Sequence, residues 1–110
     1  MINFVFKIPH PTSLIPHPRI LDIGCGTGFL TYGLAEKFPD ANIFGVDISH
    51  SMIKVARGKM GHKPYFLATD GSVLPYKNEA FDIVMSNLTY QWIDNLEGSF
   101  REACRVLRPG

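Results

Sequence analysis

A glycine-rich segment that begins with a carboxylate is the part of the sequence best suited to chemistry. Leu21-Asp-Ile-Gly-Cys-Gly-Thr-Gly28 places alternate glycines directly after Asp22. Glycines let the backbone turn sharply and approach a ligand closely, and the start of a following helix supplies amide donors and positive potential. The segment favours a site for a ligand that carries a nucleoside. A tight turn between a strand and a helix is the alternative interpretation.

A second carboxylate strengthens the nucleoside interpretation. Asp47 stands 19 residues after Gly28, at the end of the next expected strand, where a carboxylate can accept hydrogen bonds from both ribose hydroxyls. A nicotinamide dinucleotide site would need Gly-x-Gly-x-x-Gly, but the third glycine comes one residue early and Phe29 stands in its place. The spacing therefore disfavours a nicotinamide-dependent oxidoreductase, which stays open as an alternative.

These residues need strands and helices to position them, and the apolar pattern predicts both. Short apolar runs predict strands over 19–23, 43–46, 65–68 and 81–85. Apolar spacings of three and four predict helices over 28–38, 52–60 and 96–107, the second capped by Ser49 or Ser51. Residues 71–79 are expected to form a loop or short helix. The alternation predicts an α/β fold with a partial, doubly wound parallel sheet.

The chain is expected to form one domain over residues 19–110, preceded by an irregular segment. Its 110 residues, 45% of them hydrophobic, suffice for a single core. Prolines at positions 9, 11, 16 and 18 forbid a continuous helix there and remove backbone donors from any central strand. Residues 1–18 are therefore predicted to be irregular.

Charge and cysteine content set the expected partners and compartment. A formal net charge of +1 without clustered basic residues predicts no nucleic-acid partner and no anionic membrane surface. Cys25 and Cys104 form no Cys-x-x-Cys pair, and the four histidines share no short ligand spacing, so no metal site is indicated. We expect a reducing, cytoplasmic location, because neither a secretory signal nor a spanning segment is recognisable.

Five segments, in order, resemble the signature segments of class I S-adenosylmethionine-dependent methyltransferases. They are Leu21–Gly28, Val46–Ser49, Ala68–Asp70, Phe81–Val84 and Arg105–Gly110. The resemblance covers residues 19–110 and implies a Rossmann-like methyltransferase fold with S-adenosylmethionine as cofactor. Members of that family close the sheet with a fifth strand and an antiparallel pair. The sequence stops at Gly110, before the segment that would form these strands. We therefore expect only the first four strands here, with the strand over 81–85 left as an uncovered apolar edge.

The resemblance also implies which residues contact the cofactor. Asp22 and the glycine loop would surround its methionine part, and Asp47 would hold the ribose. Ile48 would pack against the adenine, Asp70 and Gly71 would contact the adenine amino group, and Asn87 would lie near the reacting sulfonium. The implied contact residues are Asp22, Gly24, Cys25, Gly26, Gly28, Asp47, Ile48, Asp70, Gly71 and Asn87.

A narrower resemblance concerns the methyl acceptor. Met85-Ser-Asn-Leu-Thr-Tyr-Gln-Trp-Ile-Asp-Asn-Leu96 is similar to the segment after the fourth strand in malonyl-carrier-protein methyltransferases of biotin synthesis. It implies a small-molecule or acyl-carrier-protein-bound carboxylate as acceptor. Tyr90, Gln91 and Trp92 could line the substrate pocket or simply pack in the core. A carboxylate is ionised at neutral pH and needs no general base, so no catalytic side chain is expected.

Two alternatives to this function stay open. The first is a cofactor-binding fragment without turnover. The second is a methyltransferase that acts on a quinone precursor or another small molecule. The sequence does not indicate the oligomeric state.

Overall fold

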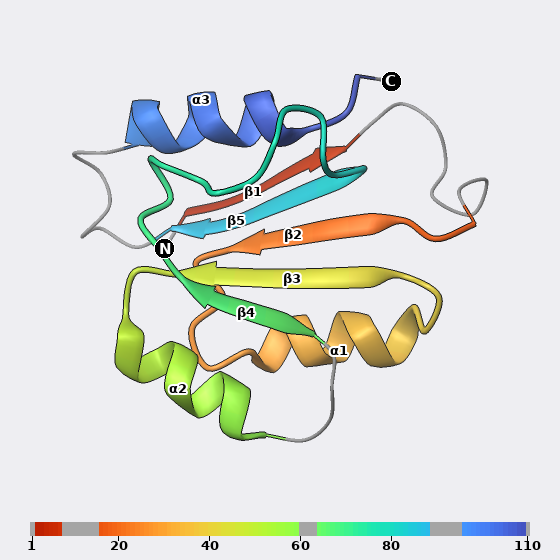
Figure 1. Ribbon diagram of the computed structural model, residues 1–110, viewed down its shortest axis with the longest axis vertical. Helices are drawn as coiled ribbons and strands as arrows, with labels where there is room; N and C mark the ends of the chain where they lie inside the picture. Colours follow the sequence, from red (N-terminus) through yellow and green to blue (C-terminus); the bar gives the residue numbers. More distant parts are fainter. Residues whose placement is uncertain (1, 8–15, 60–63, 89–95, 110) are drawn as a thin grey trace.

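A computed structural model of the chain describes residues 2–7, 16–59, 64–88 and 96–109 (Figure 1). The strands and helices alternate along most of the chain. Their order is β1 (Ile2–Lys7), β2 (Arg19–Ile23), α1 (Phe29–Lys37), β3 (Asn42–Asp47), α2 (His50–Gly58), β4 (Tyr65–Ala68), β5 (Ile83–Leu88) and α3 (Leu96–Val106). None of the helices in this described part combines the length and apolar composition needed to cross a bilayer.

The strands form one sheet in the order β1-β5-β2-β3-β4. Strands β2, β3, β4 and β5 are parallel, and β1 runs antiparallel to β5. The parallel strands all end at the same edge of the sheet, on the left in Figure 1. The prediction of an α/β fold with four parallel strands is confirmed.

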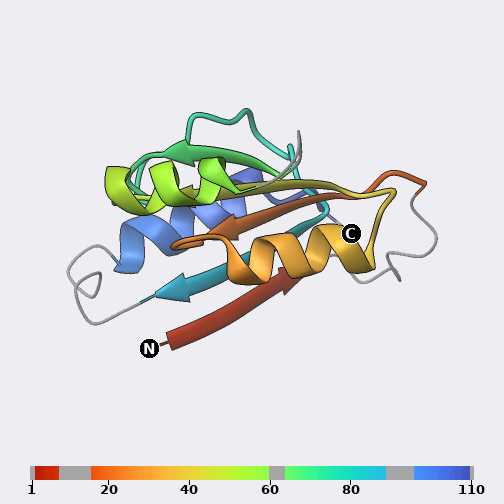
Figure 2. The same ribbon diagram turned by 90° about the horizontal axis from the view of Figure 1, so that it is seen from below.

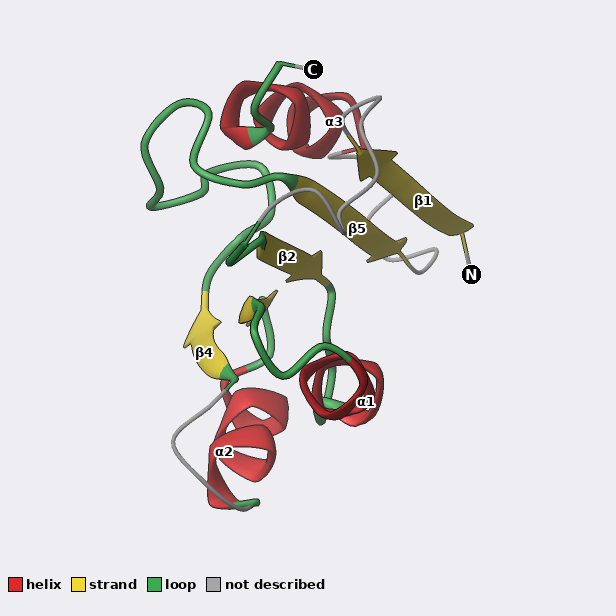
Figure 3. Ribbon diagram, turned by 90° about the vertical axis from the view of Figure 1, so that its right-hand side faces the viewer, coloured by secondary structure: helices red, strands yellow, loops and turns green. Residues whose placement is uncertain are grey.

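Helices cover both faces of the sheet, so its central strands are buried on both sides. Ile20 and Ile43 pack with Leu34 on the face covered by α1, whereas Leu21 packs with Ala103 of α3 on the other face. Helix α2 lies on the same side as α1, and Figure 3 shows α3 across the sheet from both. Adjacent residues of β2 therefore point to opposite cores, as the strand period of two requires.

The expectation that residues 1–18 are irregular is wrong for Ile2–Lys7, which forms β1. Restrictions from proline begin only at Pro9, and the run Ile-Asn-Phe-Val-Phe-Lys is rich in β-branched and aromatic residues, which favour strands. The expectation of an uncovered apolar edge is wrong as well. Figure 2 shows β1 beside β5. In the register of this antiparallel pair, Ile2 is opposite Leu88 and Lys7 is opposite Ile83.

Most of the other predicted elements lie close to the observed ones, and the strand over 81–85 differs most. Strand β5 starts two residues later, because Phe81 pairs outside the sheet: its N–H donates to Val106 O at 2.9 Å, and its carbonyl accepts from Arg108 N at 2.7 Å. Helix α2 starts at His50, where the Ser49 hydroxyl accepts from Met52 N. Residues 71–79 form a loop.

Candidate functional site

The predicted site residues follow the parallel strands, and the fold brings them to one edge of the sheet. The glycine loop follows β2, Asp47 ends β3, Asp70 and Gly71 follow β4, and Asn87 belongs to β5. These strand ends lie side by side on the left of Figure 1. Crevices at the carboxyl ends of such sheets are the usual place for a ligand. Tyr90, Gln91 and Trp92 lie outside the described residues.

The glycine loop is built from backbone conformations that favour glycine. Gly24, Gly26 and Gly28 have φ values of 77°, 58° and 89°. Two amides of the loop, Gly24 N and Cys25 N, donate to Val46 O at 2.7 and 3.0 Å, which ties the loop to β3. The loop is therefore preorganised by the neighbouring strand.

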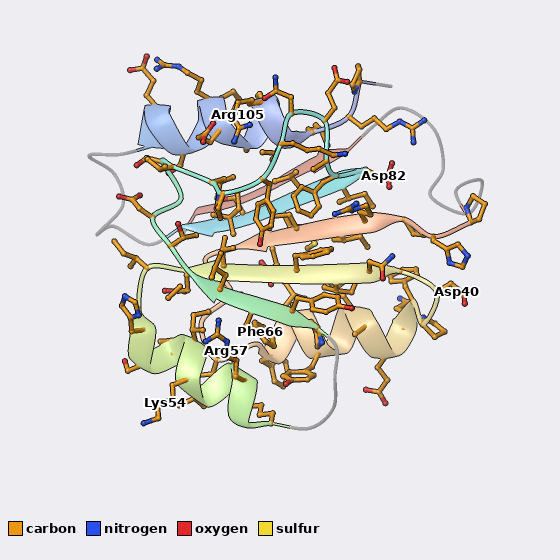
Figure 4. The ribbon with its side chains drawn as sticks, in the orientation of Figure 1. Asp40, Lys54, Arg57, Phe66, Asp82 and Arg105 are labelled. Atoms are coloured by element: carbon orange, nitrogen blue, oxygen red, sulfur yellow. The ribbon has the colours of Figure 1, made fainter. Side chains whose placement is uncertain are left out.

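Close packing adds a second requirement at Gly28. A Cβ atom there would lie 2.9 Å from Cζ of Phe66, a separation that real Cβ contacts essentially never show. The Phe66 carbonyl on β4 accepts from the Arg57 guanidinium, at 3.1 Å from Nε and 2.7 Å from Nη2 (Figure 4). Gly28 therefore lets the loop pass close to the ring of Phe66, a residue of strand β4 whose carbonyl is held by Arg57.

Asp47 connects the glycine loop to the start of α2. Its Oδ2 accepts from Gly26 N at 2.8 Å and its Oδ1 accepts from Ser49 N at 2.9 Å. Each carboxylate oxygen can accept a second hydrogen bond, and the side chain is only partly buried. Asp47 therefore retains acceptor capacity for ribose hydroxyls, and its contact with the ribose stays a prediction.

Asp22 lies beneath the same loop and is 1% exposed. Its Oδ2 accepts from the Thr31 hydroxyl at 2.9 Å, whereas Oδ1 is buried and has no partner among residues 2–7, 16–59, 64–88 and 96–109. Burial raises the pKa of the Asp22 carboxyl to about 6, the Thr31 hydrogen bond opposes this, and the charge of Asp47 adds to it. A buried carboxylate oxygen without a donor fits a ligand that carries an ammonium group.

The first turn of α1 offers backbone amides with positive potential, opposite in sign to the Asp22 carboxylate. Gly28 is its N-cap and provides no side-chain hydrogen bond, whereas α2 is capped by the Ser49 hydroxyl. Uncapped amides at a helix N-terminus carry positive potential and bind anions. Asp22 and this helix end therefore carry charges complementary to an ammonium and a carboxylate group, and their contact with the methionine part of S-adenosylmethionine stays a prediction.

Cys25 is not a nucleophile in this arrangement. Burial raises the pKa of its thiol to about 12, and the nearby carboxylates of Asp22 and Asp47 act in the same direction. Its side chain packs in a cluster with Ile53 and Phe66. Because the thiolate is the reactive form, Cys25 acts here as a small apolar residue of the loop.

The side of the site formed by β4 is held by α3. The Asp70 Oδ1 atom accepts from both the amide and the hydroxyl of Ser72 at 2.9 Å, which shapes the turn. Gly71 is buried, and a Cβ atom there would lie 3.2 Å from Cγ2 of Ile23 and 3.3 Å from Oγ of Ser99. Ile48, by contrast, is 49% exposed and accessible to a ligand. Adenine contacts at these residues stay predictions.

Sequence reasoning did not identify Thr31, Glu102 and Arg105. Glu102 Oε1 accepts from Leu74 N at 2.9 Å and Arg105 Nη2 donates to Leu74 O at 3.0 Å. Helix α3 therefore binds both backbone polar groups of Leu74 in the loop after Gly71. Thr31 did carry a signal, because it is a polar residue on the helix face that also carries Leu34 and Ala35. Nothing in the sequence pairs Leu74 with residues about 30 positions later.

An open hollow of about 480 Å³ lies beside the outer surface of α1. Its lining is mostly apolar and includes Phe29, which is 88% exposed. None of the predicted cofactor contacts lines it. The lining residues are Phe29, Leu30, Tyr32, Gly33, Glu36 and Lys59.

Comparison with known proteins agrees with this geometry. Residues 21–110 match the family described as "Methyltransferase domain". The malonyl-[acyl-carrier protein] O-methyltransferase of Geobacter sulfurreducens is 43% identical over 91 residues, which are 81% of this chain and 34% of that protein. The chain spans about a third of the length of the curated relatives it matches.

Solved structures show the same fold. A structure of a SAM-dependent methyltransferase from Methanosarcina mazei has a TM-score of 0.70 and 26% identity, over 94% of this chain and 55% of that one. The plantazolicin methyltransferase BpumL, solved in complex with SAH, has a TM-score of 0.54 and 32% identity, over 59% of this chain and 25% of its own.

Proposed function

The chain belongs to the methyltransferase-domain family, and from that premise we propose that it binds S-adenosylmethionine at the carboxyl edge of its sheet. The proposed reaction is transfer of the cofactor's methyl group to a carboxylate. The observation that carries the proposal is the buried, unpartnered Oδ1 of Asp22 beneath a glycine loop that Asp47 fixes. Asp22 would bind the amino-acid group of this ligand, and Asp47 would bind its ribose.

The residues of this chain would bind and orient rather than transfer protons. When bound, the cofactor supplies a methyl group on a sulfonium, which a nucleophile can attack directly. A carboxylate is ionised at neutral pH, so no general base is needed. Correct alignment of the two reactants can contribute on the order of 7 to 11 kcal/mol in favourable cases.

The acceptor we propose first is a malonyl group on an acyl-carrier protein. The support is the printed name of relatives that are more than 40% identical, together with the similarity of the segment Met85–Leu96. Another small-molecule carboxylate or a quinone precursor is the alternative acceptor. A cytoplasmic location belongs to the same proposal and is supported by two free cysteines.

Calorimetric titration of S-adenosylmethionine into the chain tests the cofactor part. Asp47→Ala should weaken binding roughly tenfold or more, because hydrogen bonds to a charged group are lost. Asp40→Ala is the matched control, since Asp40 is exposed and lies at the other end of the sheet (Figure 4). Circular dichroism should show that both variants fold. Saturable binding that is equally tight in the Asp47 variant would contradict the ribose contact.

Transfer of labelled methyl groups tests the acceptor. Malonyl-carrier protein should accept label from the cofactor, whereas acetyl-carrier protein should not, because its acyl group has no free carboxylate. If the chain binds the cofactor but labels neither carrier protein, the result would favour cofactor binding without turnover on this acceptor. Labelling of both would place the methyl group elsewhere than on the acyl carboxylate.

A further inference from the structure

The contact between Thr31 and Asp22 lies in the core, below the proposed cofactor site. Thr31 is fully buried, Asp22 is 1% exposed, and the hydrogen bond between them is 2.9 Å long. Thr31 is the third residue of α1 and faces the sheet, and its β-branched side chain has few rotamers. The contact therefore fixes how the carboxylate is turned.

Within the described residues, the fold uses only one oxygen of this carboxylate. The hydroxyl of Thr31 has a single hydrogen to donate, and it goes to Oδ2. Oδ1 is left as a buried acceptor next to the loop that leads into α1. It can be satisfied in two ways, by a donor group of a ligand or by a proton of its own.

We propose that Thr31 is a positioning residue that presents Asp22 Oδ1 to the cofactor's ammonium group, and that this group and a proton compete for the carboxylate. The inference rests on the proposed function and adds a pH dependence to it. A protonated carboxyl attracts no cation. The cofactor therefore binds the ionised form and, on the acid side of neutrality, releases a proton to the solvent.

The charged and titratable groups around Asp22 make the competition measurable near neutral pH. From β3 it faces the Asp47 carboxylate, from the glycine loop the Cys25 thiol, and from α1 the neutral hydroxyl of Thr31. In the described part of the chain no cation pairs with it. Burial and Asp47 hold the pKa of Asp22 near 6 without a ligand. Below that pH each further unit should weaken binding about tenfold.

The first test compares two ligands over pH 5 to 8 by calorimetry. S-adenosylmethionine should bind about tenfold more weakly at pH 5 than at pH 7. Methylthioadenosine, which keeps the nucleoside but lacks the amino-acid group, should show no such dependence. Titration at pH 6 in two buffers with different ionisation enthalpies should show release of about half a proton with S-adenosylmethionine only.

The second test changes the donor. Thr31→Val keeps the shape but removes the hydrogen bond to the charged form, so the midpoint of the pH dependence should rise by on the order of one pH unit. Thr31→Ser keeps the donor and should retain the midpoint of the wild type. A merely structural role for Thr31 would weaken both ligands equally in the valine variant and leave the midpoint unchanged.

The outcomes separate the inference from the function on which it rests. S-adenosylmethionine binding that is constant from pH 5 to 8, or a matching pH dependence for methylthioadenosine, would overturn the competition. A folded chain that binds neither ligand at any pH would overturn the proposed function, and the inference with it. The wild-type comparison of ligands stands even where the valine variant does not fold.

Discussion

Two buried aspartates lie at opposite ends of the sheet and differ in how completely they are paired. Asp82 is 5% exposed, and both of its oxygens have partners: Arg19 N donates to Oδ2 at 2.9 Å and Arg108 Nη1 lies 3.3 Å from Oδ1. Asp22 is 1% exposed, and its Oδ1 has no partner in the part of the chain that the structure describes. Figure 4 places Asp82 at the end of the sheet opposite the proposed cofactor site.

The side chains and backbone around the two carboxylates differ as well. Beside Asp82, the guanidinium of the exposed Arg19 lies 5.4 Å from the ring centre of Phe44 and 5.8 Å from that of Phe81. Around Asp22 the chain turns through glycines with positive φ. Removing a fully paired carboxylate leaves its donors unsatisfied, which destabilises the fold, whereas the half-paired carboxylate of Asp22 carries an uncompensated cost of burial and provides an acceptor for a ligand.

Replacing Asp22 should give the largest effect. Its folded-state pKa of about 6 lies above the ordinary value of 3.8, so the stability it contributes is present below pH 3.8 and is lost as pH rises through 6. Asp22→Asn should therefore raise the free energy of unfolding at pH 7 by up to about 3 kcal/mol. Urea unfolding at pH 4 and pH 7 measures this, and the two proteins should converge at pH 4. Parallel pH profiles would contradict it.

The same substitution at Asp82 should act in the opposite direction. Asp82→Asn leaves one of its donors, Arg19 N or the Arg108 guanidinium, without its carboxylate oxygen. The expected loss is roughly 1 to 3 kcal/mol of unfolding free energy at pH 7. The same urea experiment measures it. An unchanged or raised stability would show that complete pairing does not distinguish Asp82 from Asp22.

Gly28 and Gly33 differ in how closely other atoms approach them. Gly28→Ala should lower the free energy of unfolding by about 2 kcal/mol, because it combines a positive φ with the 2.9 Å approach to Phe66. Gly33→Ala is the matched control, since it lies on the exposed side of α1 and an added Cβ would meet no atom within 4 Å. This second change should raise stability by about 0.5 to 1 kcal/mol. Thermal unfolding compares them, and equal effects would refute the packing argument.

The smallest expected effect is on thiol reactivity. At pH 8 iodoacetamide should modify the exposed Cys104 and leave Cys25 largely unmodified, because burial holds the pKa of Cys25 at about 12. Asp22→Asn removes one of the charges that raise this pKa, so alkylation of Cys25 should become a few times faster. Mass spectrometry of peptides from a time course gives both rates. No change at Cys25 would contradict a charge effect of Asp22 on the Cys25 thiol.

The sequence predicted those elements and residue positions that depend on the spacing of nearby residues. The strand β4 has the predicted bounds, and α1 differs from the prediction by one residue at each end, because apolar spacing and flanking turns determine such elements. Asp47 was expected at the end of a strand and is found there. Its hydrogen bond to Gly26 was not predictable, since it depends on how far the positive-φ loop bends back toward β3.

Features that depend on distant residues were not predictable. Strand β1 pairs with a segment about 80 residues later, and prolines restrict the backbone only after its end at Lys7. Phe81 was expected inside a strand but pairs with the residues after α3. The partnerless oxygen of Asp22 arises from burial by α1, and no spacing in the sequence reveals burial of a single atom.

The pairing of β1 with β5 has a consequence for biosynthesis. Ile2 lies opposite Leu88, so β1 leaves the ribosome long before its partner exists. At about 5 to 20 residues per second, the interval lasts on the order of 4 to 17 seconds. Strands β2 and β3 are close in sequence and can pair in that interval, whereas the apolar β1 must wait. The nascent chain therefore exposes an unpaired strand that other unfinished chains could capture before β5 is complete.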